Sequence, residues 1–303
     1  MSDEAKPTRC GYVAIVGAPN AGKSTLLNHF VGSKVSIVSP KVQTTRARTL
    51  AIAMVGQAQL VFVDTPGIFE PKRRLEKAMV AAAWSGAEEA DVVLLLIDSQ
   101  RGADADVRLI LDGLTNVKRP VFLVLNKIDE VPREKLLALT AEFIAMRSFA
   151  GVFFISALEG DGVNDVKQAI AEALPEAHWL YPEDQLTDIS ERLLASEITR
   201  EKLFLRLHQE LPYNLTVETE TWKDQKDGSA RVEQVIYVTR EGHKPIVLGK
   251  GGQTIKAIGA LARHEMEKVL DRRIHLFLFV KVRENWTDDP ERYRAMGLDF
   301  PKG

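Results

Sequence analysis

The sequence contains a single cysteine, Cys10, and its 40 basic and 42 acidic side chains leave a net charge of only −2. One cysteine excludes an intramolecular disulfide and a cysteine-rich zinc site, and it fits a reducing compartment. The balanced charge gives no overall bias toward polyanions, although it allows a local basic surface. Hydrophobic residues make up 45% of the 303 residues, which is ordinary for a globular protein, and the length predicts two or three domains.

Long apolar runs are also missing. The aliphatic and aromatic runs at residues 92–97 and 276–280 are far shorter than the roughly 18 residues that a membrane span needs. The first ten residues, MSDEAKPTRC, contain two acidic side chains and no apolar run, unlike a secretory signal or a mitochondrial presequence. The six histidines show no metal-binding or catalytic-triad spacing. We therefore expect a soluble, cytoplasmic protein with no transmembrane segment.

Over the first 175 residues, short aliphatic runs alternate with helical patterns. The runs lie at residues 12–16, 60–63, 92–97, 121–125 and 152–155, and the helical patterns at 22–31, 75–88, 105–114, 133–147 and 163–174. Near-continuous apolar strands separated by helices predict a mostly parallel α/β sheet that is covered on both faces. Ligands bind at the carboxyl ends of the strands in such sheets.

The pattern changes in the second half of the chain. Residues 175–188 contain two prolines and no periodicity, which predicts a linker. Beyond it, a helical pattern at 190–208 precedes strand-like runs at 215–222 and 231–239, and Asp227-Gly228 between the two runs is a hairpin signal. A glycine-rich loop, a helix at 253–270 and a strand at 274–282 follow. This order predicts an α+β domain. Its elements follow the order α-β-β-α-α-β if the stretch before the glycine loop is helical.

Residues 17–24, GAPNAGKS, match the pattern G-x-x-x-x-G-K-S/T between a strand and a helix. The glycines let backbone N–H groups approach phosphate oxygens, and the helix N-terminus adds positive potential. In this pattern Lys23 reaches the outer phosphates and the Ser24 hydroxyl binds Mg²⁺. The predicted nucleotide-binding residues of this loop are Gly17, Ala18, Pro19, Asn20, Ala21, Gly22, Lys23, Ser24 and Thr25.

Two further motifs follow predicted strands. Asp64-Thr65-Pro66-Gly67 places a carboxylate beside the phosphate loop, where Asp64 can hold Mg²⁺ through water. The N–H of Gly67 can face the γ-phosphate. In Asn126-Lys127-Ile128-Asp129, the Asp129 carboxylate can accept hydrogen bonds from N1–H and the exocyclic amine of guanine. Adenine offers neither donor at those positions, so the motif selects guanine.

Asn126 and the stem of Lys127 would brace the base, and Ser156-Ala157 fits the remaining base-contacting loop. Four motifs in this order resemble the guanine-nucleotide-binding switch proteins over residues 10–175. The resemblance implies a P-loop GTPase fold, GTP or GDP with Mg²⁺ as ligands, and a switch I segment at residues 33–48. Within that segment Thr45 is the expected ligand of Mg²⁺, with Thr44 as the alternative.

The expected catalytic residues are Lys23, Thr45 and Gly67, and the expected metal ligands are Ser24, Thr45 and Asp64. Ras-like proteins carry a water-orienting glutamine directly after the D-x-x-G motif, whereas this chain has Ile68 there. Intrinsic turnover should therefore be slow. Asn20 resembles the asparagine of a subgroup that holds K⁺ against the phosphates, so K⁺ is a further expected cofactor, unless Asn20 only shapes the loop.

The second glycine loop has the G-x-x-G form at Gly249, Lys250, Gly251 and Gly252 and precedes a predicted helix that carries Lys256. Residues 241–283 contain nine basic and four acidic side chains, as expected of a surface that contacts a phosphate backbone. Loop and element order resemble the type II KH domain, in which the loop clamps single-stranded RNA. We interpret the aromatic residues Trp222, Phe277 and Phe279 as core residues rather than base-stacking platforms.

A GTPase domain followed by a KH domain, with QTTR at 43–46 and YPEDQLTD at 181–188, resembles the Era family of bacterial GTPases over almost the whole chain. The resemblance implies binding to 16S ribosomal RNA near its 3′ end and a role in assembly of the 30S subunit. It also implies a monomer that contacts the inner face of the cell membrane only peripherally.

The expected domains are an N-terminal tail at 1–10, a GTP-binding domain at 11–175, a linker at 176–189, a KH-type RNA-binding domain at 190–284 and a C-terminal tail at 285–303. Two alternatives to a GTP-hydrolysing switch stay open: an RNA-binding assembly chaperone with negligible turnover, and a GTPase of tRNA modification. The second lacks any appended modification chemistry in this sequence.

Overall fold

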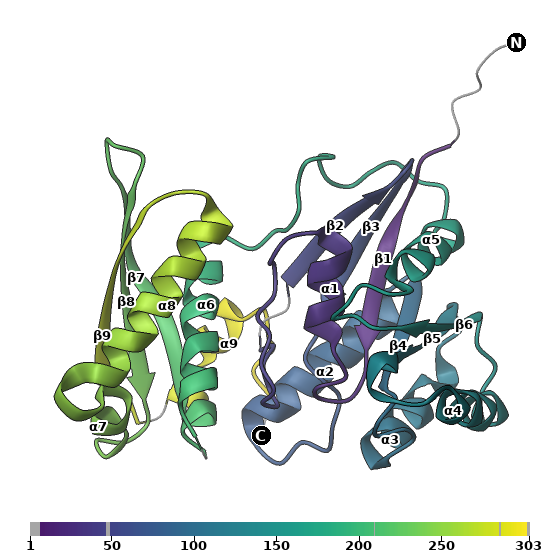
Figure 1. Cartoon of the computed structure of the whole chain (residues 1–303), viewed down its shortest axis with the longest axis horizontal. Helices are drawn as coiled ribbons and strands as arrows, with labels where there is room; N and C mark the ends of the chain where they lie inside the picture. The colour runs from purple at the N-terminus through teal and green to yellow at the C-terminus, as the bar shows by residue number, and fades with distance from the viewer. Residues whose placement is uncertain (1–6, 47–48, 209, 285, 302–303) are drawn as a thin grey trace, which may run out of the picture. The chain divides into compact units, whose positions relative to one another are not determined.

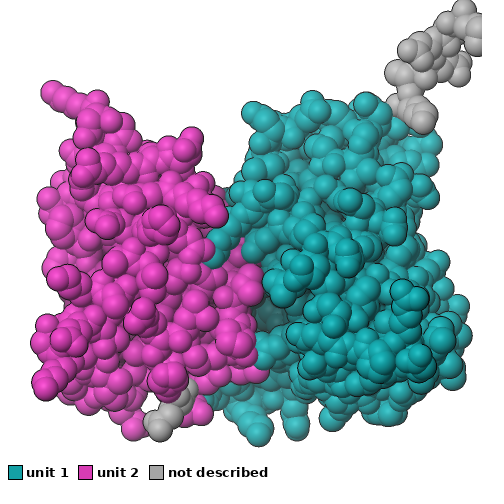
Figure 2. All heavy atoms as spheres, in the orientation of Figure 1, with its two compact units in different colours: residues 1–35, 45–188, 293–303 teal, residues 36–44, 189–292 magenta. Residues whose placement is uncertain are grey.

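The computed structural model describes residues 7–46, 49–208, 210–284 and 286–301. The chain divides into two compact units, shown in Figure 2. Unit 1 comprises residues 1–35, 45–188 and 293–303, and unit 2 comprises residues 36–44 and 189–292. The predicted switch I segment is therefore divided between the units, and its residues 47 and 48 lie outside the described residues.

Unit 1 is built on a six-stranded sheet with the order β2-β3-β1-β4-β5-β6, in which only the β2–β3 pair is antiparallel. The strands are β1 Arg9–Val16, β2 Thr49–Val55, β3 Ala58–Asp64, β4 Val92–Asp98, β5 Val121–Asn126 and β6 Gly151–Ile155. The mostly parallel sheet is confirmed. The sequence patterns missed β2, which pairs with β3 across the two-residue turn Gly56-Gln57.

Helices cover both faces of this sheet (Figure 1). One apolar cluster joins α1 Lys23–Val31 and α5 Val163–Ala173 to one face. A second joins α2 Arg74–Glu89, α3 Ala105–Gly113 and α4 Arg133–Met146 to the other. Double coverage explains why every residue of β4, VVLLLID, is buried.

Residues 176–188 contain no helix or strand, yet they run along the edge of the unit 1 sheet. The Ile52 N–H donates to the Leu186 carbonyl oxygen at 2.8 Å. The Thr187 hydroxyl donates to the Leu50 carbonyl oxygen at 2.6 Å, and the Leu50 N–H donates to the Asp188 carboxylate at 2.7 Å. The absence of periodicity predicted only a linker, because one backbone bond and two isolated polar side chains, Thr187 and Asp188, leave no repeating sequence pattern.

Unit 2 has the order α6 Glu191–Arg206, β7 Leu215–Asp224, β8 Ala230–Val238, α7 His243–Leu248, α8 Gln253–Leu270 and β9 Ile274–Val282, so the predicted α-β-β-α-α-β order is confirmed. Strand β8 lies between antiparallel β7 and parallel β9. Helices α6 and α8 cover one face of this sheet (Figure 1). The remaining short elements are η1 Leu114–Asn116, η2 Ile128–Glu130, η3 Leu211–Asn214, η4 Lys250–Gly252, η5 Trp286–Asp288 and α9 Pro290–Ala295.

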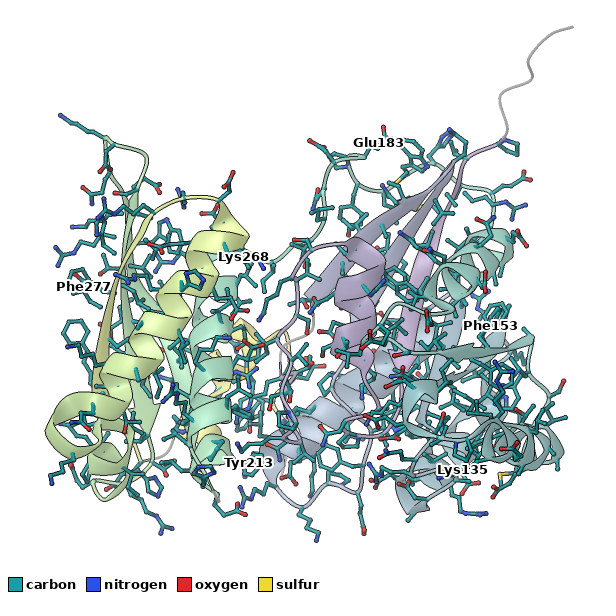
Figure 3. The ribbon with its side chains drawn as sticks, in the orientation of Figure 1. Lys135, Phe153, Glu183, Tyr213, Lys268 and Phe277 are labelled. Atoms are coloured by element: carbon teal, nitrogen blue, oxygen red, sulfur yellow. The ribbon has the colours of Figure 1, made fainter. Side chains whose placement is uncertain are left out.

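The other face of the unit 2 sheet carries exposed aromatic residues. Phe277 is 42% exposed and Phe279 is 49% exposed, and Figure 3 shows Phe277 pointing away from the helices. The interpretation of these two residues as core was wrong. Alternation along β9 turns Leu278 and Val280 toward the apolar cluster instead. Trp222 does pack against the core.

Candidate nucleotide and RNA sites

The predicted nucleotide-binding motifs meet at one edge of the unit 1 sheet. Because β1, β3, β4, β5 and β6 run in parallel, their carboxyl ends share that edge. The phosphate loop connects β1 to α1, and the other groups end or follow the neighbouring strands: Asp64, Asp98, Asn126 and the Ser156-Ala157 pair.

The phosphate loop is shaped so that only glycine fits at Gly22. This residue has φ 99°, and a Cβ atom there would lie 2.2 Å from the Asn126 amide nitrogen. The buried Lys23 ammonium group donates to the carbonyl oxygens of Gly17 and Ala18, at 3.0 and 2.9 Å. The lysine is thereby held inside the loop at the N-terminus of α1.

Burial lowers the pKa of Lys23 from 10.5 to about 8, and the nearby Asp64 carboxylate opposes this shift. A desolvated ammonium group lacks the solvation that water would give it. Phosphate oxygens would supply strong charge-assisted hydrogen bonds in place of that water. The loop thus holds a cation that is poorly compensated by the protein and suited to polyphosphate.

Asn126 connects the phosphate loop to the predicted base-binding loop. Its amide nitrogen donates to the Ala21 carbonyl oxygen at 2.8 Å, and its amide oxygen accepts from the Ala157 N–H at 2.9 Å. The Ser156 hydroxyl accepts from the Glu159 N–H at 3.2 Å and so shapes that loop from within. A single buried side chain therefore fixes two loops relative to each other.

The neighbouring residues of the N-K-x-D motif lie at the rim. The Lys127 ammonium group pairs with Asp98 at 2.5 Å, and this pairing holds the lysine stem over the end of β4. Asp129 lies exposed in η2, where its carboxylate is open to a ligand.

The predicted metal ligands come together near Lys23. The hydroxyl oxygens of Ser24 and Thr45 lie 3.1 Å apart. Adjacent oxygens of an octahedral Mg²⁺ shell are separated by about 3 Å, given Mg–O distances near 2.0–2.1 Å. Asp64, buried at the end of β3, supplies the carboxylate, and its charge acts on Lys23. These residues fit the hard-oxygen set that Mg²⁺ prefers.

The alternative ligand, Thr44, is engaged elsewhere. Its hydroxyl donates to the Lys41 carbonyl oxygen at 2.7 Å. The geometry thus favours Thr45 over Thr44 in the role of metal ligand.

Sequence reasoning overlooked two residues at this edge. Arg101 donates to the Pro19 carbonyl oxygen at 3.1 Å and pairs with Asp104 and Asp106, so it supports the phosphate loop from outside. Asp98 holds Lys127. A signal for Asp98 existed, since it ends the apolar run 92–97 at the ligand-binding edge, whereas nothing in the sequence marked Arg101.

Ile68, which stands at the position of the Ras-like glutamine, is fully buried in an apolar cluster with Ala18 and Val80. Its N–H donates to the Gly17 carbonyl oxygen at 3.2 Å. The side chain is therefore a core group and has no means of orienting a water molecule.

In unit 2 the G-x-x-G loop lies between α7 and α8. A Cβ atom at Gly249 would lie 2.1 Å from the Thr254 hydroxyl oxygen, so the loop can turn there only with glycine. Gly252 is the N-cap of α8. Lys250, Gly251 and Lys256 are exposed, and they leave backbone and positive charge accessible to a phosphate chain.

Comparison with known protein families agrees with both sites. Residues 12–127 match the model of a family described as 50S ribosome-binding GTPase, and residues 210–287 match the model of the KH domain. The chain is also 62% identical over 298 residues to GTPase Era of Rhizobium meliloti (strain 1021), covering 98% of this chain and 95% of the relative. The chain belongs to the Era family of GTPases.

GTPase Era of Brucella suis biovar 1 (strain 1330) is 57% identical over 298 residues, or 98% of this chain and 96% of the relative. Among solved structures, Era in complex with MgGDPNP and nucleotides 1506–1542 of 16S ribosomal RNA superposes with a TM-score of 0.91 at 41% identity, covering 96% of this chain and 99% of that one. A variant of Aquifex aeolicus Era bound to GDP·AlF4⁻ gives a TM-score of 0.90 at the same identity and the same coverage.

Proposed function

We propose that this member of the Era family is a GTP-binding and GTP-hydrolysing switch that binds 16S ribosomal RNA and acts in assembly of the small ribosomal subunit. The observation that carries the proposal is the convergence of Lys23, Ser24, Thr45 and Asp64 at the sheet edge where Asn126 clamps the base-binding loop. One family description names the 50S particle, but the solved Era complex that covers both units contains 16S RNA.

Each nucleotide-site residue then has a role in phosphoryl transfer. Lys23 would neutralise charge on the outer phosphates, and Ser24, Thr45 and Asp64 would hold Mg²⁺. The bound Mg²⁺ supplies further charge neutralisation. The Gly67 N–H would face the γ-phosphate, and Asp129 would select guanine. Catalysis under this proposal consists of positioning and electrostatic stabilisation.

In unit 2, the G-x-x-G loop at 249–252 and Lys256 would contact the RNA backbone within the proposed KH-type domain, residues 190–284. The proposed GTP-binding domain covers residues 11–175. The match of unit 2 to the KH model supports this function over that of a GTPase of tRNA modification.

The buried Ile68 favours slow intrinsic turnover and keeps an RNA-binding assembly chaperone as the second candidate. GTP hydrolysis measured with and without an oligonucleotide of the 16S RNA 3′ end distinguishes the two. If the protein is a switch, the RNA should change its rate of GTP hydrolysis; a chaperone with negligible turnover should show no such change. Single-turnover hydrolysis above about 1 s⁻¹ without any partner would contradict the assigned role of Ile68, because even Ras needs its activator to exceed that rate.

We expect K⁺ to speed GTP hydrolysis. Asn20 lies in the phosphate loop with φ 64°, in the left-handed region that asparagine adopts more readily than most residues other than glycine. If its side chain holds K⁺ against the phosphates, the cation would do the electrostatic work of an arginine finger. Rates compared in KCl and NaCl at equal ionic strength test this, with Asn20→Ala as the variant that should lose the difference. Equal rates for the unaltered protein would remove K⁺ from the mechanism.

We expect Gly251→Asp to weaken RNA binding by about tenfold or more without changing GTP hydrolysis measured in the absence of RNA, because a carboxylate in the clamp repels phosphate. Gly251 has φ 59°, so a side chain there costs some backbone strain, but a Cβ atom would meet only open space, and aspartate adopts this left-handed region more readily than most residues.

Gly228→Asp is the matched control, since Gly228 also has a positive φ, at 83°, and open space, but lies in the β7–β8 hairpin. Fluorescence anisotropy with a labelled RNA measures both variants. RNA affinity equal in Gly251→Asp and Gly228→Asp would refute the clamp.

We also propose a cytoplasmic location and a monomeric state, which family membership supports. Within the described residues, no helix is long and apolar enough to cross a membrane. An encounter with the inner face of the cell membrane would therefore be peripheral.

A further inference from the structure

The part of switch I that belongs to unit 2, residues 36–44, is bound along helix α6. The Val38 N–H donates to the Glu201 carboxylate at 2.8 Å. Arg200 donates to the Thr44 carbonyl oxygen, and the Lys41 ammonium group donates to the Phe204 carbonyl oxygen. Both ends of the segment are thus hydrogen-bonded to successive residues of one helix.

The two α6 residues that hold the segment are charged and buried. Arg200 is 1% exposed and Glu201 is 3% exposed. Arginine and glutamate are almost never buried to this degree unless they are paired. Arg200 pairs with Glu197, its Nε donating at 2.8 Å, and it lies over the Phe204 ring at 5.1 Å.

Glu201 pairs with Lys202 at 2.6 Å, and Lys202 also pairs with Glu265 of α8. The helical period places residues 197, 200, 201 and 204 on one face of α6. Buried ion pairs contribute little to stability compared with apolar side chains of similar size. Their presence at this face calls for a role other than packing.

The bonded segment ends one residue before a predicted metal ligand in the sequence. Arg200 binds the carbonyl oxygen of Thr44, and the next residue is Thr45, whose hydroxyl lies 3.1 Å from that of Ser24. The Thr44 hydroxyl bonds within the segment itself. The segment is therefore fixed by α6 and by its own turn up to the peptide bond that precedes Thr45.

We propose that Arg200 and Glu201 are positioning residues for GTP binding and hydrolysis: they hold residues 36–44 in the conformation that presents Thr45 to Mg²⁺. This inference rests on the proposed function of the nucleotide site. Their hydrogen bonds go to the backbone of residues 36–44, and neither residue belongs to the nucleotide-binding motifs. Each hydrogen bond restricts residues 36–44 before the nucleotide binds. The conformational entropy that this segment loses when Thr45 binds Mg²⁺ is therefore smaller.

The test compares affinities for Mg²⁺-GDPNP and Mg²⁺-GDP in the full chain. The first variant is Arg200→Met with Glu197→Gln, which removes the bond to Thr44 without leaving the partly buried Glu197 carboxylate unpaired. Arg206→Met, an exposed position in the last turn of the same helix, is the matched control. Circular dichroism and thermal unfolding report whether each variant folds.

We expect the double variant to lose about tenfold in affinity for Mg²⁺-GDPNP, the size expected from one charge-assisted hydrogen bond. Its affinity for GDP should stay within about twofold, and half-maximal hydrolysis should need more Mg²⁺. Thr45→Ala should show the same selective loss, and combining it with the double variant should add little, because both act on one group. Arg206→Met should change neither affinity.

An unchanged ratio of GDPNP to GDP affinity in the folded double variant would overturn the proposal. Should that variant fail to fold, Glu201→Gln and Glu201→Met supply the second comparison. Glutamine can still accept from the Val38 N–H and should keep the ratio, whereas methionine should lower it, and equal ratios would overturn the proposal. Absence of GTP binding by the unaltered protein would instead refute the proposed function, so the two failures are distinguishable.

Discussion

Replacing Asp129 with Asn should lower the affinity for GTP and GDP by a factor of about 10²–10³. The carboxylate is exposed in η2, beside the loop that Asn126 fixes. It can accept two hydrogen bonds from guanine at the same time, and each charge-assisted bond contributes about 1.5–3 kcal/mol. An amide keeps one acceptor but turns its NH₂ group toward a donor on the base, so one bond is lost and the other loses its charge.

Xanthosine nucleotides provide the sharpest measurement of this change. Xanthine carries a carbonyl where guanine carries the exocyclic amine, so the amide of Asp129→Asn can donate to it, and affinity for XTP should rise while affinity for GTP falls. Glu130→Gln is the matched control, because Glu130 is an exposed carboxylate in the same short helix. Discrimination between GTP and XTP that is the same in both variants would show that Asp129 does not contact the base.

Replacing Lys23 with Ala should abolish measurable hydrolysis and lower nucleotide affinity by at least about 10²-fold, yet stabilise the nucleotide-free fold. Burial lowers the pKa of Lys23 from 10.5 to about 8. A lowering of this size corresponds to about 3 kcal/mol of free energy of unfolding lost at pH 7. The variant also loses the packing of the aliphatic lysine stem, which offsets part of this stabilisation. We therefore expect a net gain of about 1–2 kcal/mol in the free energy of unfolding of the variant.

The pH dependence of the stability difference tests whether the buried charge of Lys23 is its cause. A lysine whose pKa is lower in the folded protein than in the unfolded chain destabilises the fold fully below pH 8, and this effect is relieved as pH rises from 8 toward 10.5. The stability difference between Lys23→Ala and the unaltered protein should therefore shrink by about 2 kcal/mol between about pH 7 and pH 9.5. Denaturant unfolding at the two pH values measures it. If Lys23→Ala were less stable than the unaltered protein by the same amount at both pH values, burial of the Lys23 ammonium group would not be destabilising, and the explanation would be contradicted.

Much of the nucleotide site was predictable because its groups occupy fixed places relative to apolar strands. Asp64 and Asn126 end strands whose residues are almost all apolar. The carboxyl ends of parallel strands lie at one edge of the sheet regardless of the conformation of the loops. The bracing role of Asn126 was expected, but its simultaneous bonds to Ala21 and Ala157 join residues far apart in sequence. No local pattern encodes such a pairing.

The errors have physical causes as well. Strand β2, TLAIAMV, does contain an apolar run, but its alanine and methionine residues favour helices over strands, so its local propensity did not mark it as a strand. Phe277 and Phe279 looked like core residues because aromatic side chains in strands usually are, yet β9 lies at the sheet edge and turns them outward. The local sequence did not single out Arg200 and Glu201 on α6, because the residues that bond to them, Thr44 and Val38, lie 156 and 163 positions away in the sequence.

The central claim is that the nucleotide seated at the edge of the unit 1 sheet controls how the unit 2 loop at 249–252 holds RNA. The most direct test is the affinity of the full chain for an oligonucleotide of the 16S RNA 3′ end, measured with Mg²⁺-GDPNP and with Mg²⁺-GDP. We expect tighter binding with GDPNP, in keeping with the solved Era complex that contains both ligands. Equal affinity in the two states, with both nucleotides shown to be bound, would contradict it.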